Sequence, residues 1–232
     1  MRAGKLYLIP SFLNEPDPSL IPEQTKNIVN NLHIFMVEDA RSARRFLRAI
    51  GYPHSFDTRA TLYELNKHGA PDCDKMFALV KRGNSAGLIS EAGCPCVADP
   101  GAELVAYAHR HRIEVVPLIG PSAVLLALMA SGLNGQSFCF AGYLPIKEPE
   151  RSRKIREIES AARNGTTQIF METPYRAQKI FEELLRTLKP DTRLCVAANL
   201  TLPGQYVFTT TVAAWKNEST NLNKQYCMFL LG

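Results

Sequence analysis

The segment AGLIS at residues 86–90 and the loop EAGCPCVADPG at residues 91–101 decide the fold class. The first is a short apolar run, typical of a buried strand, and a helix is predicted at 102–112. The 12 residues of Ser90–Gly101 make a long connection, because strand-to-helix loops usually have about 2 to 6 residues. Glycines let a backbone approach a ligand closely, and ligands bind at the carboxyl ends of parallel strands. We therefore expect a binding loop here, with a plain connection as the alternative.

Strands and helices alternate on both sides of this loop. Short apolar runs predict strands at 5–9, 33–37, 86–90 and 113–118. Helices are predicted between them at 24–32, 40–50, 75–82 and 102–112. Asp39 is a favourable N-cap for the helix at 40–50, and Gly51 closes that helix. This alternation is typical of a mostly parallel α/β sheet.

A break in the pattern follows at Gly120-Pro121, since proline is favoured in the first turn of a helix and an apolar helix is predicted at 122–131. The rest of the chain predicts a further set of strands at 138–141, 167–171, 193–197, 206–211 and 226–231. A turn is predicted at 142–145, and helices are predicted from the charged segment 147–156 to about 164 and over 177–188. We therefore expect two α/β domains, 1–119 and 120–232.

The composition describes an ordinary globular protein. Of its 232 residues, 46% are hydrophobic and 21% are charged, and the net charge is +5. This mild excess of positive charge permits an anionic partner such as RNA without requiring one. The longest apolar stretch, 123–130, is too short to span a membrane, and no secretory signal is recognised. Because the six cysteines lack the spacing of a disulfide scaffold or a zinc site, we expect a cytoplasmic protein without a metal.

Two further features suggest ligands, each with a structural alternative. The turn Gly120–Ala123 precedes a helix N-terminus whose free N–H groups could hold a polar ligand group, or the turn could simply cap the helix. Four arginines share one face of the predicted helix 40–50 and could grip phosphates, or they could form a solvated face: Arg41, Arg44, Arg45 and Arg48. Neither GxGxxG nor GxxxxGK[ST] occurs, so a standard dinucleotide fingerprint or P-loop is not expected.

Several motifs, in this order, carry a family resemblance. Val37–Arg41 reads like A-E-D-T-R, and the loop from Ile89 to Gly101 reads like S-D-A-G-T-P…D-P-G. Val115–Ala123 reads like V-V-P-L-P-G-P-x-A, Phe138–Pro145 like F-x-x-x-G-F-L-P, and Glu172–Arg176 like E-S-x-H-R. Together they resemble the tetrapyrrole methylase superfamily, most closely its small-subunit ribosomal RNA (cytidine 2′-O)-methyltransferase branch.

The resemblance implies a two-domain α/β methyltransferase, usually a homodimer, that binds S-adenosylmethionine in a cleft between the domains. By matching motifs, Glu91, Ala92, Gly93 and Cys94 would line the methionine or ribose side of the cofactor. Ser122 and Ala123 would contact it from the other domain, and Met171 and Ala198 would approach its adenine. Pro10 and Leu13, in the segment matched to T-P-I-G-N-L, complete the implied cofactor set.

The implied substrate side is less complete. Ala197–Leu202 stands where the family has A-R-E-L-T-K, and Lys224-Gln225-Tyr226 stands where it has K-G-E, so several titratable groups are missing. Glu38, Asp39 and Arg176 are the candidates for substrate-side catalytic residues. Helix capping and a surface ion pair are the alternative roles for these three.

These observations favour an S-adenosylmethionine-dependent methyltransferase that acts on ribosomal RNA, in the small ribosomal subunit, at a ribose 2′-oxygen. A poorly nucleophilic hydroxyl needs activation by a base, so the missing charges leave two alternatives open. One is a methyltransferase of the same fold with a small-molecule or other substrate. The other is a catalytically impaired paralogue that still binds the cofactor.

Overall fold

The computed structural model describes residues 3–65 and 71–232. The chain forms two compact units, Met1–Ser122 and Ala123–Gly232, which are described separately below. The division falls between Ser122 and Ala123, a little beyond the predicted domain boundary after residue 119. Ser122 therefore belongs to the first unit, whereas the sequence placed it with the second.

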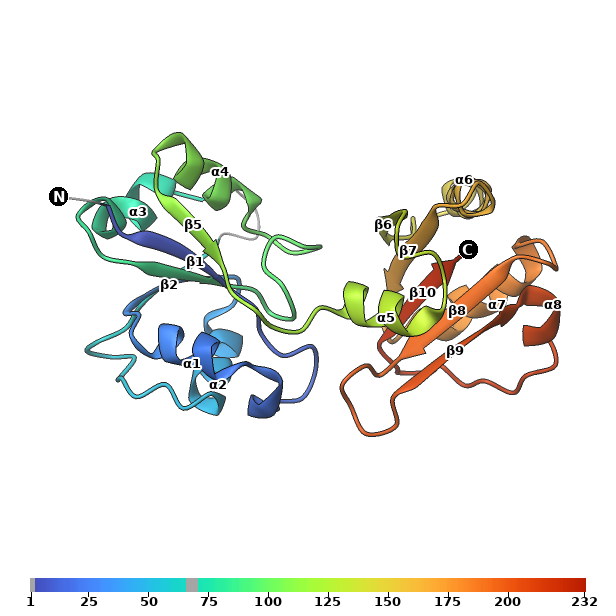
Figure 1. The fold of residues 1–232 in the computed structure, drawn as a ribbon, viewed down its shortest axis with the longest axis horizontal. Coiled ribbons are helices and arrows are strands. Elements are labelled where there is room, and N and C mark those ends of the chain that lie inside the picture. Colours follow the sequence, from blue (N-terminus) through green and yellow to red (C-terminus); the bar gives the residue numbers. More distant parts are fainter. Residues whose placement is uncertain (1–2, 66–70) are drawn as a thin grey trace. The chain divides into compact units, whose positions relative to one another are not determined.

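The first unit contains a five-stranded sheet in which every strand pair is parallel (Figure 1). The strand order is β3-β2-β4-β1-β5. The strands are β1 (Lys5–Ile9), β2 (Ile34–Val37), β3 (Thr61–Glu64), β4 (Ala86–Ile89) and β5 (Glu114–Pro117). All were predicted except β3, a short edge strand with exposed ends that lacks an apolar run.

Helices cover both faces of this sheet. The helices α1 (Glu23–Asn30) and α2 (Ala40–Ala49) lie on one face, while α3 (Cys73–Lys81) and α4 (Ala102–Arg110) lie on the other (Figure 1). A single 3-10 turn, η1 (Pro18–Leu20), precedes α1. Successive residues of a strand point to opposite faces, so Phe35 of β2 packs beneath α1 and α2 while Met36 packs beneath α3 and α4.

The second unit has a mixed sheet in the order β6-β7-β10-β8-β9. Its strands are β6 (Phe138–Tyr143), β7 (Thr167–Glu172), β8 (Arg193–Ala198), β9 (Tyr206–Thr211) and β10 (Cys227–Leu231). Only β6 and β7 are parallel, and the remaining pairs are antiparallel. The predicted turn at 142–145 is wrong at its start, because β6 continues to Tyr143 through an irregularity after Phe140.

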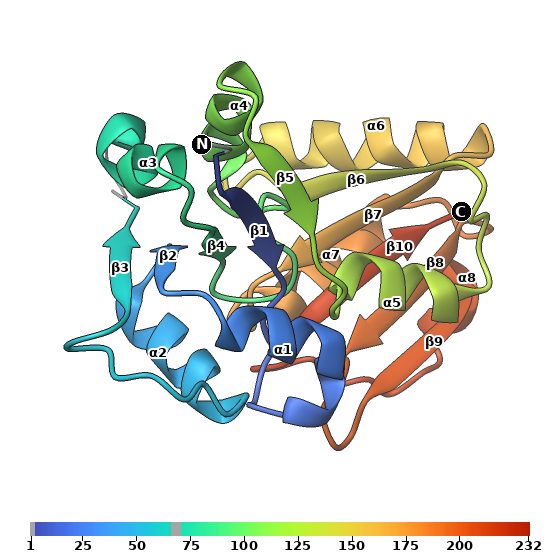
Figure 2. The ribbon, with the colours of Figure 1, turned by 60° about the vertical axis from the view of Figure 1, so that its left-hand side comes forward.

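The helices of the second unit also divide between two faces (Figure 2). One helix, α5 (Ala123–Ser131), packs on β8, β9 and β10. The other face is covered by α6 (Glu150–Arg163), α7 (Ala177–Thr187) and α8 (Val212–Trp215). The core on that face is centred on Trp215, whose indole N–H donates to the Leu194 carbonyl at 2.8 Å. Within the described residues, no helix is long and apolar enough to cross a membrane.

Candidate functional site

The loops that follow β1 and β4 are bonded to each other at the carboxyl ends of the first sheet. The Ser11 amide donates to the Gly93 carbonyl at 2.9 Å, and the Ser11 hydroxyl donates to the Ser90 carbonyl at 3.1 Å. The Ser90 hydroxyl donates to Gly93 at 3.3 Å. We call this side of the first unit, with the start of α2 and the Gly120–Ser122 turn, the carboxyl edge. Because the strands are parallel, every loop that follows a strand is at this edge.

Glycines allow the segments of the carboxyl edge to approach closely. Gly93 has a φ of +68°, and a Cβ there would lie 3.1 Å from Leu13 Cδ2. A Cβ on Gly120 would lie only 2.5 Å from Pro10 Cβ, a contact that a rigid proline ring cannot relieve. The implied cofactor residues Pro10, Leu13 and Gly93 therefore meet in one place, beside Gly120.

Cys94 connects this loop to the turn before α5. Its thiol donates to the Pro121 carbonyl at 3.5 Å. Burial raises the pKa of the Cys94 thiol, while a hydrogen bond with Ser122 opposes this shift. Cys94 is therefore a neutral thiol at physiological pH, suited to packing and hydrogen bonding rather than nucleophilic attack.

Glu91 and Ala92 are exposed on the same loop. Seven implied cofactor residues thus lie at the carboxyl edge: Pro10, Leu13, Glu91, Ala92, Gly93, Cys94 and Ser122.

Three carboxylates also gather at the carboxyl edge. The Glu91 amide donates to Glu38 Oε2 at 3.3 Å. Burial raises the pKa of Asp99 to about 6, and the negative charges of Glu38 and Glu91 add to this shift, while the Ser90 hydroxyl opposes it. A carboxyl group with such a pKa can accept a proton near neutral pH. Asp99 was not among the predicted site residues, although its place in the Asp99-Pro100-Gly101 motif could have indicated it.

Asp39 has a structural role at the start of α2. Its carboxylate accepts a hydrogen bond from the Ser42 amide at 2.7 Å, which is the expected geometry of an N-cap. This contact agrees with the capping alternative for Asp39. Within the described part of the chain, no group of three or more His, Cys, Asp or Glu residues could hold a metal ion.

The remaining implied residues lie in the second unit. Met171 is half-buried near the end of β7, and Ala198 ends β8 with its side chain in the core. Any cofactor contact from Ala198 would therefore come from its backbone. Ala123 begins α5.

Arg176, a predicted catalytic residue, forms an ion pair in the second unit. Its Nη2 lies 3.2 Å from Glu172 Oε2, and the Glu172 side chain is completely buried. The other carboxylate oxygen of Glu172 accepts a hydrogen bond from the Thr173 amide at 2.8 Å. The ion-pair alternative for Arg176 therefore describes its contact in the structure.

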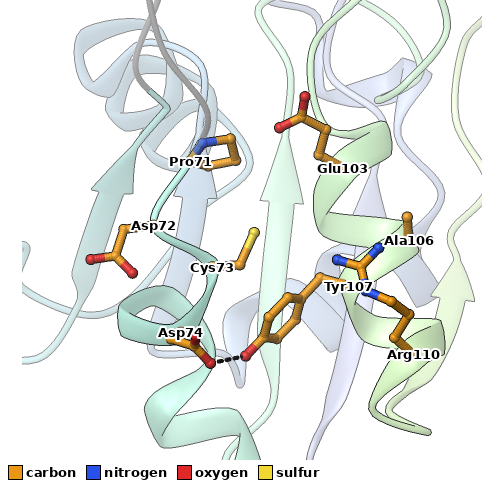
Figure 3. Close-up of a pocket in the computed structure, with 8 residues that line it drawn as sticks. All are labelled: Pro71, Asp72, Cys73, Asp74, Glu103, Ala106, Tyr107 and Arg110. Carbon is orange, nitrogen blue, oxygen red and sulfur yellow. Dashed lines mark hydrogen bonds between the residues drawn. The ribbon is translucent and has the colours of Figure 1, made fainter.

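A cavity of about 500 Å³ lies between α3 and α4, away from the implied cofactor residues (Figure 3). The Tyr107 hydroxyl donates to Asp74 at its lower end, and Cys73 and Arg110 also line it. A smaller cavity of about 310 Å³ includes Asp99 and shares Pro71 and Glu103 with the first. These cavities extend from the Asp99 side of the loop along the α3 and α4 face.

Sequence comparison identifies the family. The profile of the Tetrapyrrole (Corrin/Porphyrin) Methylases matches residues 16–215. A protein named Ribosomal RNA small subunit methyltransferase I from Mesorhizobium japonicum is 36% identical over 78% of this chain and 59% of its own length. The protein of the same name from Escherichia coli is 30% identical over 95% of this chain and 75% of its own length. The protein of the same name from Vibrio cholerae is 32% identical over 84% of this chain and 65% of its own length. The chain thus spans between 59% and 75% of these relatives.

Solved structures share the fold at lower sequence identity. The methyltransferase CobJ is 17% identical, with a TM-score of 0.62 over 99% of this chain and 94% of its own. The cobalt precorrin-4 methyltransferase CbiF is also 17% identical, with a TM-score of 0.62 over 98% of this chain and 94% of its own. These matches show the fold alone. With the profile match and the curated relatives, they lead to one conclusion: the chain belongs to the tetrapyrrole methylase family.

Proposed function

We propose that this protein is an S-adenosylmethionine-dependent methyltransferase that modifies a ribose 2′-hydroxyl of small-subunit ribosomal RNA. The observation that carries the proposal is the carboxyl edge, where the loops after β1 and β4 are hydrogen-bonded together beside Gly120. The names of the relatives support the choice of ribosomal RNA as the substrate.

The residues of the carboxyl edge fit S-adenosylmethionine. Gly93 and Gly120 leave no room for side chains and so bring backbone groups close together. S-adenosylmethionine carries a positive sulfonium, and Glu38, Glu91 and Asp99 give the carboxyl edge the complementary negative charge. When bound, the cofactor would supply an electrophilic methyl group.

The protein must also orient a nucleophile and accept its proton. Orientation of two reactants can account for a large part of a rate enhancement. A ribose hydroxyl loses its proton during methylation, so a base near it accelerates the reaction. We propose that Asp99, with its pKa near 6, accepts this proton. Glu38 then acts through its charge, which helps to keep the Asp99 pKa high.

Two measurements test this proposal. Calorimetric titration should detect binding of S-adenosylmethionine, and labelled cofactor should transfer its methyl group to small ribosomal subunits that lack the modification. Nuclease digestion should then place the label on a ribose. A protein that does not bind S-adenosylmethionine would contradict the proposal as a whole.

One observation favours a second candidate, a methyltransferase of the same fold that acts on a small molecule. The segment Ala197–Leu202, at the end of β8 and after it, carries no charged residue where the family motif has three. Binding of S-adenosylmethionine without any transfer to ribosomal subunits would favour this second candidate.

We also propose that the protein works in the cytoplasm as a homodimer. Leu125 and Met129 on α5 are 52% and 80% exposed, and neighbouring exposed apolar side chains often mark a protein interface. Light scattering on the purified protein should give twice the mass of one chain, and Met129→Glu should shift it toward the monomer. A monomeric wild-type protein would contradict the dimer.

A further inference from the structure

The exposed tyrosines of this protein are confined to the second unit. The first unit contains four tyrosines, all buried or half-buried: Tyr7, Tyr52, Tyr63 and Tyr107. The second unit contains four that are 51%, 90%, 38% and 56% exposed: Tyr143, Tyr175, Tyr206 and Tyr226. A phenol ring has a large apolar surface that is usually at least partly covered, so four exposed rings in one unit call for an explanation.

The strand register places these four tyrosines at one end of the second sheet. Tyr143 is paired with Met171 across β6 and β7, and Tyr206 is paired with Ala198 across β8 and β9. Tyr226 precedes Cys227, which is paired with both Glu172 and Ala198. Tyr175 lies in the loop directly after β7.

The order of the strands spreads these tyrosines along the end of the sheet. Neighbouring strands lie about 4.8 Å apart, and β7 stands between the strand of Tyr143 and the strand that Tyr226 precedes. Their backbones are therefore separated by two strand spacings, about 10 Å. The loop that carries Tyr175 follows β7, and it lies beside the segment before β10, where the Lys224 amide donates to the Pro174 carbonyl at 3.1 Å.

The charges at this end favour an anionic ligand. Lys147 and Lys224 are exposed in the loops after β6 and before β10, whereas Arg176, beside Tyr175, is already paired with Glu172. Tyr206 differs from the other three, because it is the least exposed. Burial raises the pKa of Tyr206, a hydrogen bond with Thr220 opposes this shift, and the negative charge of Glu218 adds to it. We therefore define the tyrosine edge as Tyr143, Tyr175, Tyr226 and Lys224.

We propose that the tyrosine edge binds unpaired nucleotides of the RNA substrate, with Tyr143, Tyr175 and Tyr226 stacking on bases and Lys224 contacting a phosphate. This inference rests on the proposed function. Proteins that bind single-stranded RNA commonly combine aromatic rings, on which bases stack, with positive charge that follows the backbone. The three tyrosines replace the phenylalanine, histidine and glutamate of the family motifs, so the platform is a feature of this chain.

Fluorescence anisotropy with a labelled, unstructured RNA of ten nucleotides tests the proposal on the full-length protein. Tyr175→Ala and Tyr226→Ala should each weaken binding by about 5- to 100-fold, the range expected for loss of one base stack. Tyr175→Phe should retain the wild-type affinity, because the ring is kept. A matched control is Phe138→Ala, since Phe138 is 44% exposed at the opposite end of β6.

Salt dependence separates stacking from charge. Tyr175→Ala should leave the slope of log affinity against log salt unchanged, whereas Lys224→Ala should reduce its magnitude by about 0.7, the value for one phosphate contact on a single strand. Unchanged affinity in both tyrosine variants, or an equal loss in Phe138→Ala, would overturn the proposal. Preferential binding of a duplex of the same sequence would also overturn it.

Cofactor titration on the same samples separates this proposal from the proposed function. The tyrosine variants should bind S-adenosylmethionine as the wild type does, and a parallel loss would assign the rings to the cofactor and overturn the stacking role. If the wild type methylates ribosomal subunits but the tyrosine variants bind and methylate RNA normally, only the platform is wrong. If the wild type neither binds RNA nor transfers methyl groups to it, the RNA substrate itself is wrong.

Discussion

The carboxyl edge of the first unit and the tyrosine edge of the second are built in opposite ways. The first brings backbone segments together around glycines and carries the carboxylates Glu38, Glu91 and Asp99. The second leaves tyrosine rings exposed and has Lys224 beside them. Backbone groups and negative charge suit a small cationic ligand, whereas exposed rings and positive charge suit a polyanion. We therefore expect S-adenosylmethionine to depend mainly on the carboxyl edge, and unpaired nucleotides beyond the reacting ribose to depend mainly on the tyrosine edge.

The largest expected effect concerns the chemistry of the carboxyl edge. At saturating S-adenosylmethionine, Asp99→Asn should reduce methyl transfer by about 10²- to 10⁴-fold, the usual contribution of a general base. Because Asp99 accepts a proton only when ionised, the wild-type rate should rise with pH through about 6 and then level off. Single-turnover assays between pH 5 and 8 measure both effects. A rate that is independent of pH in that range would contradict the role of Asp99.

The stability of the same variant provides a control. The pKa of Asp99 in the folded protein, about 6, lies above the ordinary aspartate value of 3.8, so the ionised form of Asp99 destabilises the folded protein. This destabilisation is absent below pH 4 and is complete above pH 6. Screening by solvent reduces this destabilisation to about 1 kcal/mol. At pH 8, Asp99→Asn should therefore raise the melting midpoint by about 2–4 °C. In thermal melts near pH 4, Asp99→Asn and the wild type should have the same melting midpoint.

The next effect tests whether Arg176 is structural or catalytic. Arg176→Met leaves the buried Glu172 carboxylate without its partner at 3.2 Å. Removing one member of a buried pair usually costs 3–5 kcal/mol, and partial exposure of Arg176 lowers the expected loss to about 2–4 kcal/mol. Urea unfolding measures this loss, and the double variant Arg176→Met with Glu172→Gln should recover part of it. Unchanged stability with lost activity would instead make Arg176 a substrate-side residue.

A smaller effect tests the close packing beside Pro10. Gly120→Ala would place a Cβ 2.5 Å from Pro10 Cβ. Overpacking of this kind costs about 1–3 kcal/mol of folding stability, and affinity for S-adenosylmethionine should also fall, because Gly120 lies beside the implied cofactor residue Pro10. Gly135→Ala is the matched control, because a Cβ there would meet nothing within 4 Å. RNA binding at the tyrosine edge should be the same in both variants, and a loss in Gly120→Ala would show that the two edges are not independent.

The smallest effect concerns the arginines of α2. All four are exposed, and Arg44 and Arg48 lie over the Phe56 ring at 5.9 and 5.5 Å. Because α2 starts at the carboxyl edge, Arg41 is nearest to that edge and Arg48 is near the far end of the helix. Arg41→Ala should reduce the salt slope of RNA binding by about 0.7, while Arg48→Ala should not change it. Equal slopes in both variants would assign the whole stripe to a solvated face.

The sequence predicts most of the fold because most of its strands are short apolar runs, and β2, β4 and β10 are buried along their whole length. It misses β3, whose ends Thr61 and Glu64 are exposed at the sheet edge. It also ends β6 too early, because Gly142 has the backbone of a turn residue yet lies within the strand. In both places, pairing with a neighbouring strand overrides a weak local pattern.

The candidate site is predicted less completely than the fold. Motif spacing brings Pro10, Leu13 and Gly93 to one edge, because loop positions follow from the order of the strands. It places Asp99 in the Asp99-Pro100-Gly101 motif of the same loop but does not reveal the raised pKa of Asp99, which depends on burial and on the charge of Glu38, far away in the sequence. It also does not reveal the tyrosine edge, since only the register of a mixed sheet brings residues 143, 175 and 226 together.

Photocrosslinking tests the separation of the two edges most directly. RNA that contains 4-thiouridine near the modified nucleotide can be crosslinked to the protein in the presence of S-adenosylmethionine, and the attached peptides can be identified by mass spectrometry. We expect crosslinks to the peptides that contain Tyr175 and Tyr226, and we expect Tyr175→Ala to reduce them. Crosslinks confined to the first unit, with none in the second, would contradict the assignment of RNA to the tyrosine edge.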